Sequence, residues 1–499
     1  MLPTTRKDAS GFHAKPDTAL LCLRFLARRY LVFGITGFVL FSLFLRTLYV
    51  RREAPVELPV PHLDPQKQTP AERWPGMRLP PLYPQYLQYE HRLPQHHWNA
   101  PSHAAEPNMF WIPGHSAGSG WGNIMQEILL NAFLSYKANR AFVFYNYTWN
   151  SDLSQDYSDY SGKPIPSRVP LSALIRGPIV GGAWPSGVNA PLAVSEEYWH
   201  HACDDRKVVV PRADVHDHVS TWFVDAITTG WVNKLHSLNH EQCIEAGGDG
   251  GPPYTWVTFG EKDAMPGIWP EFRTSPILTH FAHSALVELA FDTNREVFSP
   301  SAIAEPPLSA APLSLPAAQR YPELPGLLVL HIRRGDYEGH CAHLARWSST
   351  YLAYNTLPEL PDRFDPPPGG AWGENTPENV AVYMQHCFPD IEQIVRRVED
   401  VAQTDAARGL EHVYIMTNGA VSWVEELKAA LGASGRWKNV ASSRDLVLNW
   451  EQKYIAQAVD MLIGQRAQVF IGNGWSSLTG NAVVMRMANG FRPDSTRFW

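Results

Sequence analysis

The sequence predicts an α/β protein in which two Rossmann-like domains follow one another along the chain. The first observation is a glycine-rich loop between a strand pattern and a helical pattern near residue 120. The second is a series of short apolar runs that alternate with helical patterns after residue 320. The third is the length of 499 residues with 44% hydrophobic residues, which exceeds the needs of one ordinary core.

The first domain is expected at 109–320. "NMFWIP" predicts a short strand, the loop "GHSAGSGWGN" occupies 114–123, and apolar residues recur at helical spacing over 123–139. "AFVFYNY" at 141–147 predicts the next strand and completes a strand–helix–strand unit. The pattern weakens from about 150 to 320, where proline- and glycine-rich stretches indicate insertions.

The second domain is expected at 321–499. Three continuous apolar runs predict buried parallel strands, and they are "LLVLHI" (327–332), "HVYIMTN" (412–418) and "QVFIGN" (468–473). Helical patterns separate these runs, at 376–407 with an interruption at Pro389, at 421–431, at 451–467, and in "WSSLTGNAVVMRMA". Strands and helices that alternate in this way predict a second doubly wound domain.

Three N-terminal segments precede the two domains: a cytosolic tail at 1–29, a transmembrane signal anchor at 30–50 and a proline-rich extended stem at 51–108. The run from Tyr30 to Leu45 carries no charge and, counted to Val50, is long enough to cross a bilayer. Lysines and arginines outnumber acids before this run, which predicts a cytosolic N-terminus and a lumenal body. We therefore expect a single-pass type II protein of the Golgi or endoplasmic reticulum membrane, with a cleaved signal peptide as the alternative.

The lumenal location bears on the cysteines and on one sequon. Cys203, Cys243, Cys341 and Cys387 can form two disulfides in an oxidising compartment, in any of three pairings. Asn146 lies in the only clear N-glycosylation sequon, and the strand propensity around it leaves glycosylation and burial equally open.

The stretch "HIRRGDY" at 331–337 follows a predicted buried strand directly. Ligands of open α/β sheets bind beyond the carboxyl ends of the strands, and an arginine there can form paired hydrogen bonds to a phosphate. One alternative is that Arg333 and Arg334 make salt bridges at the end of the sheet. Another is that Arg-Gly-Asp is an adhesion tripeptide, which requires an exposed flexible loop and is disfavoured by the preceding strand.

The stretch "FIGNGWSSLTGN" is a second anion-suited strand end. Its strand ends at Asn473, and a helix is expected to begin near Ser476 and Ser477, where unpaired backbone N–H groups and hydroxyls favour negative charge. Ordinary capping of the helix by a serine is the alternative. The glycines Gly120 and Gly122 allow close approach of backbone to a ligand, although a tight turn before a helix explains them equally well.

Composition and motif spacing argue against two other classes of site. The net charge is −7 with no long basic run in the body, so a general nucleic-acid binder is not expected. "ADVHDH" at 213–218 has no matching partner cluster, and Asp204-Asp205 lacks a strand-end DxD context. No obligatory metal or other cofactor is therefore predicted.

Taken together, "SGWGN", "HIRRGD" and "VDMLIGQRAQVFIGNGWSSLTG" resemble the GDP-fucose-dependent fucosyltransferases of the protein O-fucosyltransferase and α1,6-fucosyltransferase superfamily. The order and the distances between the motifs are also similar, and the flanking elements extend the resemblance over most of 109–499. Residues 150–320 depart from the family pattern, and acceptor specificity usually resides in that region.

The resemblance implies a GT-B fold, in which two Rossmann-like domains face each other across a donor-binding cleft, and an inverting transfer that usually needs no metal. It implies that Arg333 contacts the donor pyrophosphate, that Arg334 and Asp336 support it, and that Ser476 and Ser477 lie in the phosphate-contacting segment.

The remaining donor-site residues follow from the same resemblance. Asn123 matches the asparagine of the glycine loop, Asp460 matches an aspartate that shapes the nucleotide pocket, and His331 falls where the family contacts guanine through backbone. Asn473 belongs to the same strand-end motif as the two serines.

The chemistry of the expected reaction assigns three catalytic residues. Cleavage of the fucose–phosphate bond builds negative charge on GDP, and Arg333 would stabilise that charge. Asp336 and Glu338 are the nearby acids that can accept the proton of the acceptor hydroxyl, and the choice between them stays open. The expected function is transfer of fucose from GDP-fucose to a protein or glycan; a transferase using another nucleotide sugar, or a non-catalytic sugar-binding or adhesion protein, is the alternative.

Overall fold

The computed structural model describes most of the chain beyond residue 68. The described residues are 69–99, 106–113, 117–247, 251–254, 258, 263–300, 304–368 and 376–499. The chain divides into two units, 1–73 and 74–499, and the described part of the first is the short helix α2 (Pro70–Arg73) with Thr69 before it. The predicted membrane anchor at 30–50 lies outside the described residues, and none of the described helices is long and apolar enough to span a bilayer.

The second unit is a mixed α/β structure that contains two five-stranded sheets, and every strand pair within each sheet is parallel. The first sheet has the order β8-β2-β1-β10-β9. Its strands are β1 (Met109–Trp111), β2 (Ala141–Phe144), β8 (Val194–Ser195), β9 (Val208–Pro211) and β10 (Cys243–Gly247). The strands predicted at the start of this domain are confirmed as β1 and β2.

The second sheet has the order β14-β13-β12-β15-β16. Its strands are β12 (Leu324–Ile332), β13 (His412–Thr417), β14 (Asn439–Ser442), β15 (Ala467–Gly472) and β16 (Thr496–Phe498). The three predicted strands of this domain are confirmed as β12, β13 and β15. These strands are buried on both faces, as expected for parallel strands that read as continuous apolar runs.

Each sheet has a point at which the strand order reverses. From β12 the chain adds β13 and β14 on one side, and it then returns to place β15 on the other side of β12. In the first sheet, likewise, β2 and β8 lie on one side of β1 and β10 lies on the other. Crevices at such switch points, beyond the carboxyl ends of the strands, are where doubly wound sheets bind ligands.

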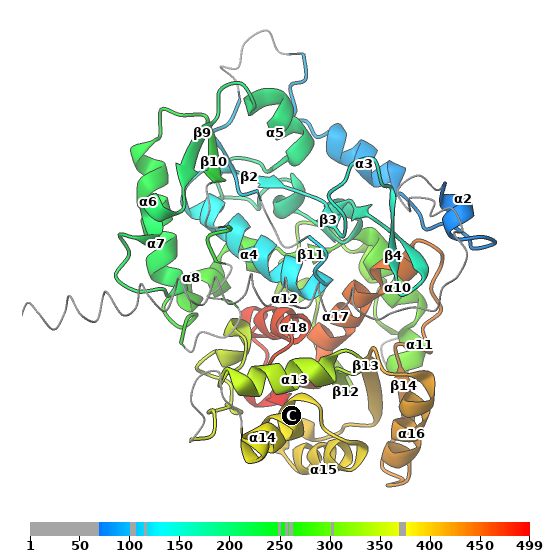
Figure 1. The fold of residues 1–499 in the computed structure, drawn as a ribbon. Coiled ribbons are helices and arrows are strands. Elements are labelled where there is room, and N and C mark those ends of the chain that lie inside the picture. The colour runs from blue at the N-terminus through cyan, green and yellow to red at the C-terminus, as the bar shows by residue number, and fades with distance from the viewer. Residues whose placement is uncertain are drawn as a thin grey trace, which may run out of the picture. The chain divides into compact units, whose positions relative to one another are not determined.

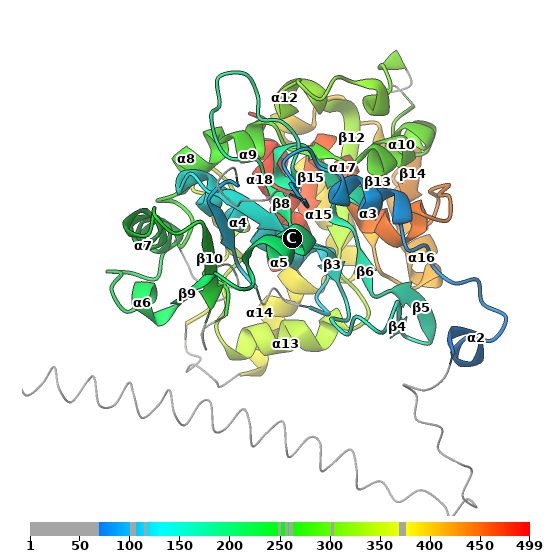
Figure 2. The ribbon, with the colours of Figure 1, turned by 90° about the horizontal axis from the view of Figure 1, so that it is seen from above.

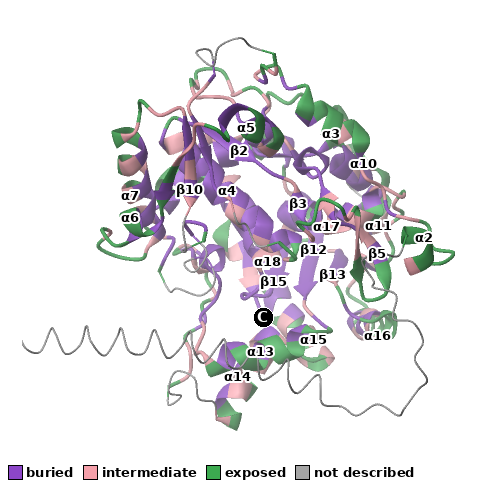
Figure 3. Cartoon of the chain, turned by 45° about the horizontal axis from the view of Figure 1, so that its top comes forward, coloured by how far each residue is buried: buried purple, intermediate pink, exposed green. Residues whose placement is uncertain are grey.

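Helix α4 (Trp121–Lys137) follows β1 of the first sheet, and helix α18 (Ser477–Ala488) follows β15 of the second sheet. The two helices pack against each other. Figures 1 and 2 show them side by side, with α18 and α17 (Ala456–Arg466) between the two groups of strands. One hydrophobic core contains apolar residues from both sheets and from these helices. Figure 3 accordingly shows α4 and the central strands as buried, whereas the helices at the periphery have exposed faces.

The other helices and short strands surround these layers. The helices are α3 (Pro84–His91), α5 (Glu196–Cys203), α6 (Ala213–His216), α7 (Val224–Ser237), α8 (Trp269–Thr274), α9 (Pro276–Thr279), α10 (Ala285–Thr293), α11 (Arg295–Phe298), α12 (Ala317–Arg320), α13 (Tyr337–Arg346), α14 (Pro377–Cys387), α15 (Ile391–Ala402) and α16 (Val421–Gly432). The two-stranded sheets pair β3 (Tyr147–Thr148) with β6 (Arg168–Val169), β4 (Tyr157–Tyr160) with β5 (Lys163–Pro166), and β7 (Ile175–Arg176) with β11 (Ala282–His283).

The predicted extended stem at 51–108 differs from the structure over 74–99, which belong to the folded unit. Tyr83 is fully buried, and its hydroxyl donates a hydrogen bond to the carbonyl of Glu451 over 2.8 Å. The indole of Trp450 in turn donates to the carbonyl of Leu79 over 3.1 Å. The prolines that suggested an extended stem are compatible with this fold because Pro84 opens α3, where its missing N–H has no helical partner to lose.

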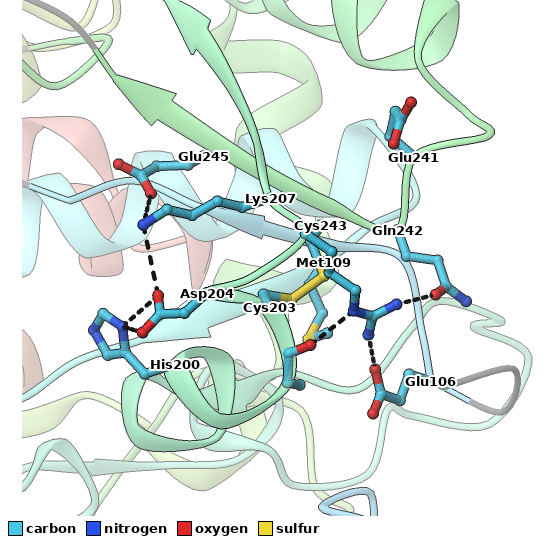
Figure 4. The surroundings of a disulfide bond; sticks show 12 residues. Glu106, Met109, His200, Cys203, Asp204, Lys207, Glu241, Gln242, Cys243 and Glu245 are labelled. Atoms are coloured by element: carbon cyan, nitrogen blue, oxygen red, sulfur yellow. Dashed lines mark hydrogen bonds and ion pairs between the residues drawn. A yellow bond between two sulfur atoms is a disulfide. The ribbon is translucent and has the colours of Figure 1, made fainter. Parts of the chain in front are cut away.

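Two disulfides form, and they select one of the three possible pairings. Cys203 at the end of α5 bonds Cys243 at the start of β10, and Cys341 of α13 bonds Cys387 of α14, with Cα atoms 5.6 and 5.8 Å apart. Figure 4 shows the first of these bonds and, at some distance from it, the ammonium group of Lys207 between the carboxylates of Asp204 and Glu245.

The sequon lies at the end of β2. Asn146 is partly exposed, whereas Tyr147 and Thr148 are buried in β3. The hydroxyl of Thr148 donates to the carbonyl of Asn146 over 3.0 Å.

Candidate active site

The two strand-end motifs predicted from the sequence lie next to each other at the switch point of the second sheet. Leu330 of β12 pairs with Ile471 of β15, so that Arg333 and Asn473 follow the carboxyl ends of neighbouring parallel strands. The stretches "HIRRGD" and "FIGNGWSS" therefore begin at neighbouring strand ends of one sheet. The site is therefore built where an open parallel sheet binds ligands.

Arg333 is held in place with most of its hydrogen-bonding capacity unused. Its guanidinium carbon lies 4.6 Å from the ring centroid of Tyr337, and its Nε atom is buried with no hydrogen-bond partner in the described structure. Its one ion pair runs 3.9 Å from Nη2 to Asp336, whose side chain is 82% exposed, so that this pair contributes little. A guanidinium oriented by stacking, with donors to spare, suits paired hydrogen bonds to a phosphate.

Tyr337 connects the two motifs, and the sequence reasoning did not single it out. Its ring carries Arg333, and its hydroxyl donates a hydrogen bond to the carbonyl of Trp475 over 2.8 Å. No local pattern marked Tyr337, because Arg333 precedes α13 and the two residues do not share a helix face.

Arg334 faces away from Arg333 and stabilises the turn. Its guanidinium carbon lies 4.3 Å from the Phe388 ring and 4.1 Å from the Trp423 ring, and it donates to the carbonyl of Pro389. Its backbone exchanges two hydrogen bonds with the side chain of Asn418, which follows β13. Burial lowers the pKa of Arg334 to about 10, so Arg334 stays charged at neutral pH. Its hydrogen bonds hold the loop after β12 against the residues that follow β13 and α14.

His331 is buried under the same turn. Its Nδ1 lies 2.7 Å from Oγ1 of Thr479, and its carbonyl accepts a hydrogen bond from the indole of Trp499 over 2.8 Å. Burial, together with the nearby Arg333, lowers the pKa of His331 to about 3. The ring is therefore neutral and holds β12 against the first turn of α18.

The loop after β15 is stabilised by Asn473, whose backbone and side chain are both fully engaged. Its amide nitrogen Nδ2 donates to the carbonyl of Cys387 over 2.7 Å, and its Oδ1 accepts from the backbone N–H of Trp475 over 3.0 Å. Ser476 precedes α18 and makes no side-chain capping bond. The hydroxyl of Ser476 and the unpaired N–H groups of the first helical turn together form an anion-suited end of a twelve-residue helix.

The glycine loop of the first domain meets this helix end. Ser477 Oγ donates to Asn123 Oδ1 over 2.5 Å, and Asn481 Nδ2 donates to the carbonyl of Gly122 over 2.8 Å. A Cβ atom on Gly122 would lie 2.6 Å from the backbone nitrogen of Leu478, so only glycine permits this approach. The predicted motif residues of both domains are thus brought together.

Other predicted site residues lie outside this cluster. Gly120 precedes α4 with open space around it, and Glu338 is exposed on α13. Asp460 accepts hydrogen bonds from the hydroxyls of Tyr414 (2.7 Å) and Ser443 (2.9 Å), and burial raises its pKa to about 6. It therefore links β13 to the residue that follows β14.

The chemistry of the cluster is that of an anion site. The groups available to a ligand are the guanidinium of Arg333, the hydroxyl of Ser476 and the backbone N–H groups at the start of α18. The hydroxyl of Ser477 and the side chain of Asn473 are hydrogen-bonded within the protein. Among the residues that the structure describes, no three His, Cys, Asp or Glu side chains are arranged to hold a metal ion.

Comparison with known proteins gives structural matches alone. No protein-family model matches the sequence, and no curated protein sequence matches it. Matching crystal structures include POFUT1 in complex with GDP-fucose, 13% identical over 78% of this chain and 97% of that chain, with a TM-score of 0.46. Another crystal form of that complex is 14% identical over 80% and 99% with a TM-score of 0.45, and the apo form is 12% identical over 77% and 97% with a TM-score of 0.44.

Proposed function

We propose that this protein is an inverting glycosyltransferase that transfers fucose from GDP-fucose to a hydroxyl group of a protein or glycan. In this proposal the two parallel sheets form a GT-B pair, and the diphosphate lies between Arg333 and the first turn of α18. The acceptor approaches from the side of the first domain, and its identity is left open.

The observation that supports the proposal most directly is the state of Arg333. The residue is partly buried at the switch point, stacked on Tyr337, and carries an unpartnered Nε among the described residues. The amino end of α18 lies beside it, because Tyr337 bonds the carbonyl of Trp475, two residues before the helix begins. Two groups that favour anions therefore meet at one place.

This arrangement suits the departure of a nucleoside diphosphate. Negative charge grows on the β-phosphate as the bond to the sugar breaks, and a positioned guanidinium lowers the barrier by stabilising that charge. Loss of one such donor costs about 2.7–4 kcal/mol, or about 10²–10³ in rate. The proposal therefore assigns charge neutralisation to protein groups and includes no obligatory metal.

The proposal places the protein in the Golgi or endoplasmic reticulum membrane as a single-pass type II protein. It is supported by the uncharged run within 30–50, by the basic residues before it, and by two disulfides in the body, which persist in oxidising compartments. Protection of the body from added protease in sealed microsomes tests this topology. Digestion of the body without detergent would contradict it.

Thermal unfolding in the presence of GDP, GDP-fucose, GDP-mannose and UDP tests the donor. Selective stabilisation by GDP and GDP-fucose supports the proposal. Stabilisation by UDP indicates a transferase that uses another nucleotide sugar. No stabilisation by any of the four indicates a non-catalytic sugar-binding or adhesion protein.

A further inference from the structure

Three rings of α13 form a row, and the guanidinium of Arg333, in the loop before the helix, lies over the first of them. The guanidinium lies 4.6 Å from the Tyr337 ring, the Tyr337 ring lies 4.8 Å from that of His340, and the His340 ring stacks at 6.3 Å on His343. Residues three apart share one helix face, so the row continues along the helix from the loop. His340 is exposed, and it is the first titratable ring in this row whose atoms are accessible to a substrate.

The two acids near Arg333 in sequence are placed less suitably for accepting a proton. The charge of Glu338 acts on Arg334, which is enclosed by Phe388 and Trp423 away from Arg333. Asp336 is exposed and pairs with Arg333 itself, so that it competes with a phosphate for the same guanidinium. His340, in contrast, lies on the side of α13 that Arg333 occupies.

We infer that His340 is the general base of the proposed transfer, taking the proton of the acceptor hydroxyl while Arg333 holds the departing diphosphate. The inference rests on the proposed function. The O–H bond of the acceptor breaks and its proton moves to the imidazole, and the oxygen forms a bond to the anomeric carbon of the sugar. The bond between that carbon and the β-phosphate oxygen breaks, and its electron pair remains on GDP. His340 then releases the proton to solvent.

The charge environment favours the basic form of His340. Although His340 is exposed, the groups packed around it displace part of its water, and this desolvation lowers its pKa below the ordinary value. The charges of His343 and Arg333 lower the pKa further, against an opposing effect of Asp336. On α14, which packs against α13, His386 is bonded to the carbonyl of Trp499. A neutral imidazole at neutral pH can accept a proton, and such a group contributes about 10²–10⁴ in rate.

The position of His340 is fixed by two anchors in the first half of α13. Tyr337, on which it packs, is anchored to Trp475, and Cys341, the next residue, is bonded to Cys387 of α14. The ring therefore projects from a braced helix, which is how a base is kept near a reacting group.

Hydrolysis of GDP-fucose by the full chain, with water as acceptor, tests the inference without knowledge of the natural acceptor. The variants are His340→Gln, His340→Ala with and without added imidazole, Glu338→Gln, and His343→Gln as the control on the same face. GDP release is measured from pH 5 to 9, and GDP affinity is measured in parallel.

We expect His340→Gln to lower GDP release at least about a hundredfold with unchanged GDP affinity, and to abolish the fall in rate at acid pH. Imidazole restores part of the rate to His340→Ala, and His343→Gln keeps the wild-type rate at pH 9. A loss of about a hundredfold in Glu338→Gln, with an unchanged rate in His340→Gln, would assign the base to Glu338 and overturn the inference. If wild type is active and His340→Gln retains its rate and pH profile, His340 is not the base. If wild type neither binds GDP nor releases it from GDP-fucose, the proposed function fails, and this inference fails with it.

Discussion

Ser477 Oγ donates a hydrogen bond to Asn123 Oδ1 over 2.5 Å, across 354 residues of sequence. The bond joins the first turn of α18 to the first turn of α4. It therefore connects the helix after β15 of the second sheet to the helix after β1 of the first sheet. Both residues were predicted site residues, and their contact brings the glycine loop of the first domain to the strand-end motif of the second.

A double-mutant cycle measures this bond. Asn123→Ala and Ser477→Ala are each expected to lower the free energy of unfolding by about 0.5–1.5 kcal/mol, because each leaves a partly buried polar partner unpaired. The double variant should lose less than the sum of the two. Urea unfolding measures the free energy of unfolding of the three variants. The control pair is Asn123→Ala with Ser434→Ala, because the hydroxyl of Ser434 donates to the carbonyl of Leu431. The losses of free energy in this control pair should be additive. Strict additivity for Asn123 with Ser477 would contradict the coupling.

Gly122 and Gly120 provide a matched pair. Alanine at 122 places a Cβ 2.6 Å from the backbone nitrogen of Leu478 and 2.7 Å from Ser477 Oγ, whereas alanine at 120 meets nothing within 4 Å. Gly122→Ala should therefore lower stability by about 1–3 kcal/mol in spite of the better helix propensity of alanine. Gly120→Ala should change it by less than about 0.5 kcal/mol. Equal melting temperatures for the two variants would show that α4 and α18 do not pack as described.

The two disulfides should have different effects on the site. Replacing either pair by serine is expected to cost about 2–5 kcal/mol of stability. Cys341→Ser with Cys387→Ser also releases α13 from α14 and should weaken GDP binding, because α13 carries the ring on which Arg333 stacks. Cys203→Ser with Cys243→Ser, at the end of α5, should leave GDP affinity unchanged where the protein is folded. Equal GDP affinity in both double variants would show that the position of α13 does not affect GDP binding.

His331 gives stability a pH dependence. Its pKa is about 3 in the folded protein, below the unfolded value near 6.5, so the unfolded state binds more protons between these values. Stability is therefore highest above pH 6.5 and falls as pH decreases, with a slope of up to about 1.4 kcal/mol per pH unit from this residue. His331→Gln should have a shallower slope between pH 6.5 and 5 in urea unfolding.

The sequence predicted the parts of the fold in which local pattern and burial agree. β12, β13 and β15 are continuous apolar runs because both faces of a parallel strand are covered. The edge strand β8 has two residues and carries no such pattern. The docking of Tyr83 onto the body was not predicted, because its partner, Glu451, is far away in the sequence.

The sequence predicted which two motifs form the candidate site, but it did not predict what each side chain in them contacts. The strand-end rule brought Arg333 and Asn473 together, because parallel strands end at one edge. Arg334 differs from Arg333 because it packs on the rings of Phe388 and Trp423. Helix packing sets the positions of these two rings, and no local sequence pattern predicts that packing. The role of Tyr337 likewise appears only once its hydroxyl reaches the loop after β15.

The central claim is that Arg333 binds the diphosphate of a nucleotide sugar, and calorimetric titration of GDP into the Arg333→Ala variant tests it most directly. The loss of charge-assisted hydrogen bonds worth about 1.5–3 kcal/mol predicts a dissociation constant at least about tenfold higher than that of wild type. The control is Arg396→Ala, at an exposed arginine of α15, which should bind GDP as wild type does. Wild-type GDP affinity in Arg333→Ala would contradict the account.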